Sequence, residues 1–91
     1  MYQIKIDLDS VIQFRREFRE LSDNLENSRH KVTADVEILN ETWSDSEFQK
    51  FYARYEEDNE FVKRLIDNID ELNDGYLYNM QDALEIYLGI K

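Results

Sequence analysis

The stretch Leu39–Phe51, LNETWSDSEFQKF, decides the fold, because it is the polar break between two long amphipathic runs. It holds Trp43, the only tryptophan of the chain, in a segment rich in Asn, Ser and Asp, which favour turns and helix caps. A break this short, at 41–45, makes the two flanking helices antiparallel neighbours. We expect Trp43 to fold back from the first helix and fill the gap beside Phe48 and Phe51.

Apolar residues on both sides of the break repeat with the heptad spacing of packed helices. In the first run they occupy one position at Val11, Phe18, Leu25, Val32 and Leu39, and a second at Phe14 and Leu21. In the second run the two positions hold Phe48, Tyr55, Val62, Ile69, Tyr76 and Ala83, and Phe51, Leu65, Leu72 and Ile86. The pattern predicts an all-α fold, a single-domain antiparallel helical hairpin over residues 1–91 with helices at about 8–40 and 46–88.

The start of each helix carries candidate capping residues. Residues 2–8 alternate between apolar and polar, which predicts a short extended arm before the first helix. Asp7 with Ser10, or Ser10 with Gln13, is then expected to cap that helix, and the second pair has the spacing of a capping box. Ser46 or Ser44 is expected to cap the second one.

Composition excludes several classes of function. The 91 residues include 21 acidic and 11 basic side chains, and a net charge of -10 disfavours nucleic acid and anionic membranes as partners. The absence of cysteine excludes disulfides and thiolate zinc sites. No Sec signal peptide or membrane-spanning run is visible, so we expect synthesis in the cytoplasm and no membrane insertion.

The second run has more apolar residues than one helix pair can bury, because each helix of a hairpin hides a single stripe. The expected partner surface consists of Tyr52, Ile66, Leu77, Met80, Leu84, Tyr87 and Leu88. Burying about six such side chains contributes on the order of 10 kcal/mol before association costs. We therefore expect a second hairpin to cover them, which gives a four-helix bundle made from two chains.

No arrangement of reactive side chains indicates an enzyme. His30 is the only histidine, and its spacing from Glu26 is that of a surface pair on a helix. The acidic segment before Gly75 departs from a calcium loop, because Leu72 stands at a ligand position and Gln81 replaces the closing Glu. We expect no catalytic residue, no metal and no cofactor.

The chain resembles the WXG superfamily of small proteins exported by type VII (ESX) secretion. Trp43-Ser44-Asp45 matches the Trp-any-Gly turn motif of that superfamily except at its last position, and Phe51 matches a common aromatic of the second helix. The resemblance implies a helical hairpin that pairs into a four-helix bundle. It also suggests a divergent member, a helical partner of a larger LXG-type toxin. Asp tolerates positive φ better than most residues, so the turn is expected to survive the loss of glycine.

The superfamily carries an export signal of the form Tyr-x-x-x-Asp/Glu late in the second helix. Tyr78 and Asp82 fit this pattern and its position, and an i, i+4 spacing puts both side chains on one face. Tyr52 and Glu56 satisfy the same spacing. The resemblance favours Tyr78 and Asp82 as the signal.

The resulting interpretation is a non-enzymatic substrate or adaptor of type VII secretion, recognised by the secretion ATPase. Its partner is a second copy, a sister small protein or the helical N-terminal domain of an LXG-type toxin. Two alternatives stay open. One is a structural or regulatory dimerisation module, and the other is an acidic immunity protein or antitoxin that uses Glu56, Glu57 and Asp58 against a basic toxin.

Overall fold

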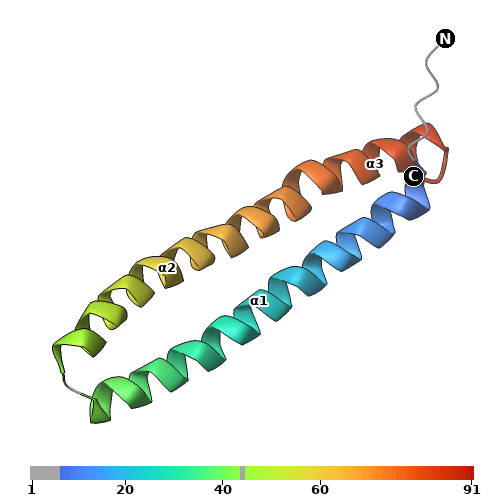
Figure 1. Cartoon of the computed structure of the whole chain (residues 1–91). Coiled ribbons are helices and arrows are strands. Elements are labelled where there is room, and N and C mark those ends of the chain that lie inside the picture. Colours follow the sequence, from blue (N-terminus) through green and yellow to red (C-terminus); the bar gives the residue numbers. More distant parts are fainter. Residues whose placement is uncertain (1–6, 44) are drawn as a thin grey trace. The chain divides into compact units, whose positions relative to one another are not determined.

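The computed structural model describes residues 7–43 and 45–91, and these ranges contain helices and no strand. In chain order the elements are α1 (Leu8–Thr42), α2 (Ser46–Glu71), the π-helix η1 (Leu72–Leu77) and α3 (Tyr78–Tyr87) (Figure 1). The fold is the all-α, antiparallel helical hairpin that the sequence predicts. Of the predicted extended arm, residues 2–6 lie outside the described residues, and Leu8 already belongs to α1.

The chain divides into two compact units, and each is described by itself. The turn unit is Asp23–Asp67 and contains the break between α1 and α2. The end unit combines the chain up to Ser22 with Asn68–Lys91.

Asp7 caps α1, which resolves the two alternatives that the sequence left open. The Asp9 backbone N–H donates to Asp7 Oδ1 at 3.1 Å, and the Ser10 hydroxyl donates to Asp7 Oδ2 at 3.5 Å. The carboxylate thus accepts from an amide of the first turn that has no partner inside the helix.

In the turn unit, α1 and α2 pack through a mixed apolar and polar seam. Val36, Phe48 and Ile66 are buried. Four hydrogen bonds cross between the helices, joining Thr33 Oγ1 to Tyr55 OH (2.6 Å), Tyr52 OH to Glu37 (2.6 Å), Arg29 to Asn59 (3.4 Å) and Gln49 to Asn40 (3.4 Å). These bonds satisfy polar groups that sit next to the apolar core.

The predicted seam of α2 is correct at one heptad position and wrong at the other. Phe48 and Ile69 are buried as predicted, but Phe51 and Leu65 are 52% and 40% exposed. Ile66, at 6% exposure, takes the place predicted for Leu65. Relative to the heptad prediction, α2 is thus rotated by one residue. Asn59 lies seven residues before Ile66 on the same face, so the rotation brings it to its hydrogen-bond partner on α1.

In the end unit, a polar network ties α1 to η1 and α3. Arg15 Nε donates to Asn73 Oδ1 at 2.8 Å, and its Nη1 donates to Gln81 Oε1 at 2.7 Å. Asn73 Nδ2 donates back to the Arg15 carbonyl at 3.2 Å. Asn73 is only 2% exposed, and Ser22, also buried, donates to Asp70 at 2.7 Å. No buried side-chain nitrogen or oxygen lacks a partner among the described residues.

The predicted second helix is interrupted, contrary to the sequence prediction. In the π-helix Leu72–Leu77 each turn contains more residues than an α-helical turn, so the heptad register changes after Ile69. Leu72 and Tyr76, predicted to lie in the seam, are exposed, and Asn73 is buried instead. Asn73 is buried at this position because its side chain forms hydrogen bonds with Arg15.

The register of the seam can be tested with two adjacent substitutions in α2. Ile66→Ala is expected to lower the free energy of unfolding by about 2–4 kcal/mol, because it leaves a cavity in the core. Leu65→Ala removes a similar volume from a partly exposed site and is expected to cost under ~1 kcal/mol. Urea unfolding at low protein concentration, followed by circular dichroism, measures both. A larger loss of stability for Leu65→Ala than for Ile66→Ala would instead support the seam predicted from the heptads.

Candidate functional site

Trp43 closes the end of α1 and covers the first turn of α2. Its backbone N–H donates to the Leu39 carbonyl at 2.8 Å, which continues the helical pattern of α1. The indole stacks on the Phe48 ring, with centroids 5.3 Å apart and planes 18° apart. The predicted packing against the start of the second helix is therefore confirmed.

Asp45 holds the turn together through its two carboxylate oxygens. Oδ1 accepts from the Phe48 backbone N–H at 2.8 Å, and Oδ2 accepts from Trp43 Nε1 at 2.6 Å. Asp45 is thus the cap of α2, in place of the predicted serines. Ser46 is the first residue of the helix, and Ser44 lies outside the described residues.

The environment of Asp45 favours its charged form. The Phe48 backbone N–H, followed by the Trp43 indole, holds the pKa of the Asp45 carboxyl below its ordinary value of 3.8. Asp45 does not have a positive φ. The turn survives the loss of glycine as expected, but it does so through the capping bonds of Asp45 and not through a positive φ.

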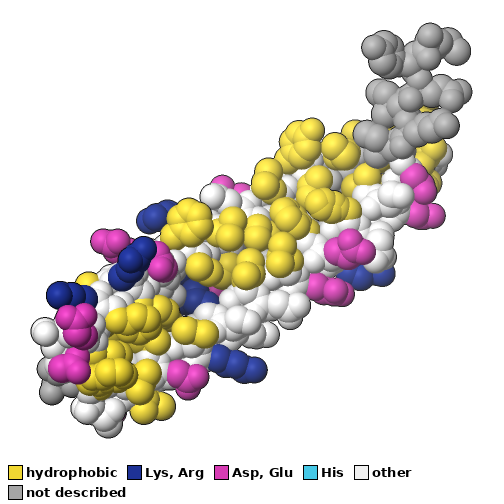
Figure 2. Space-filling view, viewed as in Figure 1, with side chains coloured by type: hydrophobic (Ala, Val, Ile, Leu, Met, Phe, Trp, Pro, Cys, Tyr) yellow, Lys and Arg dark blue, Asp and Glu magenta, His cyan; other side chains and the backbone are white. Residues whose placement is uncertain are grey.

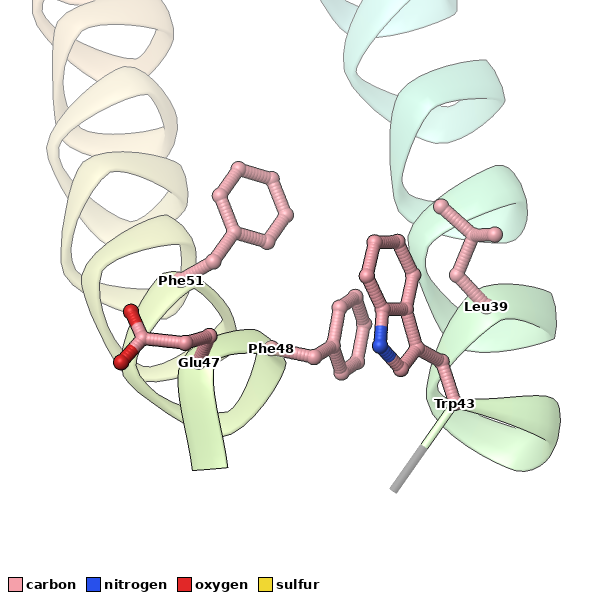
Figure 3. Close-up of a pocket in the computed structure, with 5 residues that line it drawn as sticks. All are labelled: Leu39, Trp43, Glu47, Phe48 and Phe51. Carbon is pink, nitrogen blue, oxygen red and sulfur yellow. The ribbon is translucent and has the colours of Figure 1, made fainter. Parts of the chain in front are cut away.

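A hollow of about 350 Å³ lies beside the turn. Its lining consists of Leu39, Trp43, Glu47, Phe48 and Phe51. Figure 3 shows the Trp43 and Phe48 rings lying against each other between Leu39 and Phe51, which extend from α1 and α2. The walls are apolar, and Glu47 brings a carboxylate to the rim.

A second hollow of about 260 Å³ lies farther along the same two helices. Its lining consists of Leu25, Ser28, Arg29, Val32, Tyr55, Asp58, Asn59 and Val62. Asp58 lies seven residues after Phe51 and seven before Leu65, so all three lie on one face of α2.

The two hollows are bordered by an uncovered apolar surface, here called the turn-unit stripe. It consists of Val32, Leu39, Trp43, Phe51 and Leu65, which are 40–52% exposed. Figure 2 shows hydrophobic side chains gathered near the turn and along α2. The sequence analysis missed this surface because it placed four of these residues in the seam. Asn73, which is buried, and Asn59, which is half-buried, are polar and give no apolar signal of the true register.

The partner residues predicted from the sequence have mixed environments. Ile66 belongs to the core of the turn unit, and Tyr52 is half-buried and bonded to Glu37. Leu77, Met80 and Leu84 are half-buried in the end unit, whereas Tyr87 and Leu88 are exposed. Further exposed apolar residues of the end unit are Phe14, Leu21, Leu72 and Ile86.

The structure brings Tyr78 and Asp82 together on α3. Tyr78 is its first residue and is 44% exposed, and Asp82 is half-buried one turn later. The guanidinium carbon of Arg15 lies 5.4 Å from the centroid of the Tyr78 ring, and Lys91 Nζ lies 5.6 Å from it. Lys91 also forms an ion pair with Asp82.

The second match to the Tyr-x-x-x-Asp/Glu pattern has a different environment. The Tyr52 hydroxyl donates to Glu37 at 2.6 Å, and this bond raises the pKa of Tyr52 to about 12. Its ring lies 6.2 Å from the Phe48 ring. Tyr52 is thus committed to contacts inside the hairpin, which leaves Tyr78 as the more accessible of the two tyrosines.

His30 forms a surface pair, as its spacing predicts. Its Nε2 lies 2.9 Å from Glu26 Oε1, and the His30 side chain is largely exposed. Arg29 donates to the same Glu26 oxygen at 2.6 Å and lowers the pKa of Glu26. In the described ranges, no three His, Cys, Asp or Glu side chains gather as a metal site would require, and no helix is long and apolar enough to span a membrane.

The family model described as proteins of 100 residues with WXG (WXG100) matches residues 3–84, which include the Trp43 turn and both hairpin helices. The chain belongs to the WXG100 family. Membership places it among small helical proteins associated with type VII secretion, which are not enzymes and which interact with other proteins. Comparison with curated proteins and comparison with solved structures each gave no match.

In this WXG100 protein the motif reads Trp-Ser-Asp, and the structure gives the aspartate a function of its own. Its carboxylate connects the motif's indole to the first turn of the next helix. A glycine at this position has no side chain that could accept either hydrogen bond. The substitution thus adds a direct link between the tryptophan and the helix start.

Asp45→Gly restores the family motif and removes both bonds, so the midpoint of thermal unfolding is expected to fall by a few degrees. Asp45→Asn keeps an oxygen acceptor and serves as the matched control, with a smaller expected loss. Thermal scans of the three proteins at pH 7 test this order. A glycine variant as stable as the native protein would contradict the capping role.

The same carboxylate gives a pH dependence of defined sign. Because the folded-state pKa of Asp45 is lowered, its contribution to stability is complete above the unfolded value and disappears as pH falls through the folded one. Trp43 emission should therefore change with a midpoint below pH 3.8. The Asn variant should lack this transition, and a transition that persists in it would assign the change to another group.

Proposed function

We propose that this WXG100 protein acts by binding, as a substrate or adaptor of type VII secretion that pairs with another helical protein. The observation that carries the proposal is the turn-unit stripe, an apolar surface that the hairpin leaves uncovered. Monomeric soluble proteins seldom expose contiguous apolar surface of this kind without a binding role.

The energetics favour a protein partner. The five side chains of the stripe are about half exposed, so covering them contributes on the order of 5 kcal/mol before association costs. The exposed apolar residues of the end unit add to this. The rim carries carboxylates such as Glu47 and Asp58, and the chain is strongly acidic, which disfavours nucleic acid.

A second helical hairpin is the simplest cover, and the complex is then a four-helix bundle. It can come from a second copy, a sister WXG100 protein or the helical N-terminal domain of an LXG-type toxin. Asp45 accounts for the lost motif glycine within the hairpin itself. The missing glycine therefore no longer favours a partner of different sequence over a second copy. Only the surplus of exposed apolar surface supports such a partner.

We assign Tyr78 and Asp82 as the export signal that the secretion ATPase reads. Both side chains lie on one face of α3, and Tyr78 is accessible. The competing pair, Tyr52 and Glu56, is disfavoured because the Tyr52 hydroxyl is bonded to Glu37.

Pairing can be tested by adding a charge to the stripe. Phe51→Glu should weaken association at least tenfold, because the new carboxylate is desolvated in the interface. Ala53→Glu adds the same charge to the opposite side of α2, where the residue is exposed, and should leave association unchanged. Light scattering gives the mass of the protein alone and co-expressed with a sister protein or toxin domain. A native protein that remains a single chain in every combination contradicts the proposal.

Export tests the signal separately from pairing. Tyr78→Ala and Asp82→Ala are expected to abolish secretion while leaving the helical content and the mass of the complex unchanged. Tyr52→Phe, which removes a tyrosine hydroxyl but keeps the ring, is the matched control and should be exported normally. Immunoblots of culture medium and cells measure the outcome. Normal export of the Asp82 variant would favour a module unrelated to secretion.

A further inference from the structure

Tyr78 and Asp82 already hold a cation in the free chain. The Lys91 ammonium forms an ion pair with the Asp82 carboxylate and lies 5.6 Å from the centre of the Tyr78 ring. A carboxylate beside an aromatic face suits an ammonium or guanidinium group, because the charge and the ring quadrupole both attract it.

The backbone after α3 is shaped so that Lys91 can reach this pair. Gly89 has a φ of +75°, which a residue with a side chain rarely adopts. Its N–H donates to the Ile86 carbonyl at 3.0 Å, and the Ile90 N–H donates to the Glu85 carbonyl at 2.9 Å. These two bonds form the glycine-dependent turn that ends many helices, and the turn directs Lys91 back along α3.

The contacts of Lys91 can be exchanged more easily than those of Arg15, the other cation near Tyr78. Arg15 is fixed by hydrogen bonds to buried Asn73 and to Gln81. Lys91 is half-exposed and has only the carboxylate and the ring as partners of its ammonium among the described residues. Glu85 also raises the pKa of Lys91, after the larger effect of Asp82. A basic group from another protein therefore competes for a site that attracts cations.

We propose that Tyr78 and Asp82 form a binding site for a basic side chain, which Lys91 fills in the free protein and an arginine or lysine of the receptor fills in the complex. The inference rests on the proposed export signal and adds the chemistry of the receptor group that reads it. Lys91 then acts as an internal competitor that the receptor must displace.

The internal contact can be tested without a partner. In ¹H–¹³C NMR spectra of the full chain, the Lys91 Cε protons should be shifted upfield by the Tyr78 ring. Tyr78→Leu should remove this shift, and Asp82→Asn should reduce it. Gly89→Ala should remove it as well, because the turn that directs Lys91 is strained by a side chain. A Lys91 signal at its unstructured position in the native protein would overturn the inference.

Displacement is tested by titrating the full chain with the soluble motor domains of a type VII secretion ATPase. Lys91→Ala should bind about three- to tenfold more tightly, the range expected for losing an exposed ion pair and a cation–π contact. Gly89→Ala should show the same gain, and Lys91→Arg should bind like the native protein. Lys50→Ala, which removes a lysine paired with Glu47 elsewhere, is the matched control for net charge.

The outcomes separate this inference from the proposed function. If Asp82→Ala loses binding but Lys91→Ala gains none, the cation site is overturned and the export signal stands. If Tyr78→Ala and Asp82→Ala both bind like the native protein, the signal and the cation site fail together. A gain in Lys91→Ala that disappears in the double variant with Asp82→Ala supports the inference.

Discussion

A hairpin of two helices has a single internal interface, and this constraint accounts for the apolar surface that the chain leaves exposed. Each helix can hide one stripe, so every further apolar residue stays in water until another chain arrives. In the turn unit the hidden stripe is made by residues such as Val36, Phe48 and Ile66. The residues beside it form a second apolar surface with two hollows, and that surface is where we propose that a partner helix binds.

Polar groups decide which stripe is hidden. The bonds from Thr33 to Tyr55 and from Arg15 to Asn73 join partly buried side chains on facing helices, and they would be lost in another register. Because a buried polar group without a partner costs more than a bonded one contributes, such pairs select one alignment of the helices. The larger apolar residues next to them, such as Phe51 and Leu65, remain exposed.

The sequence was sufficient for the fold class, the two helices, the turn and the packing of Trp43, because heptad periodicity and turn composition are local signals. It was insufficient for the register of the second helix. Phe51 and Leu65 look like core residues, and nothing local shows that Asn59 and Asn73 have partners far away in the chain. The capping role of Asp45 was missed for a related reason, since serine and aspartate are equally good caps and only the three-dimensional turn selects between them.

The π-helix Leu72–Leu77 also sets the angular phase of everything that follows it in the end unit. A π-turn contains an extra residue, and one residue corresponds to about 100° of rotation around a helix axis. Deleting one residue from this segment would let the helix wind regularly, but it would swing Tyr78 and Asp82 a quarter-turn around the axis relative to Arg15. The π-helix therefore sets the direction in which the side chains of α3 point, although it lies before them in the chain.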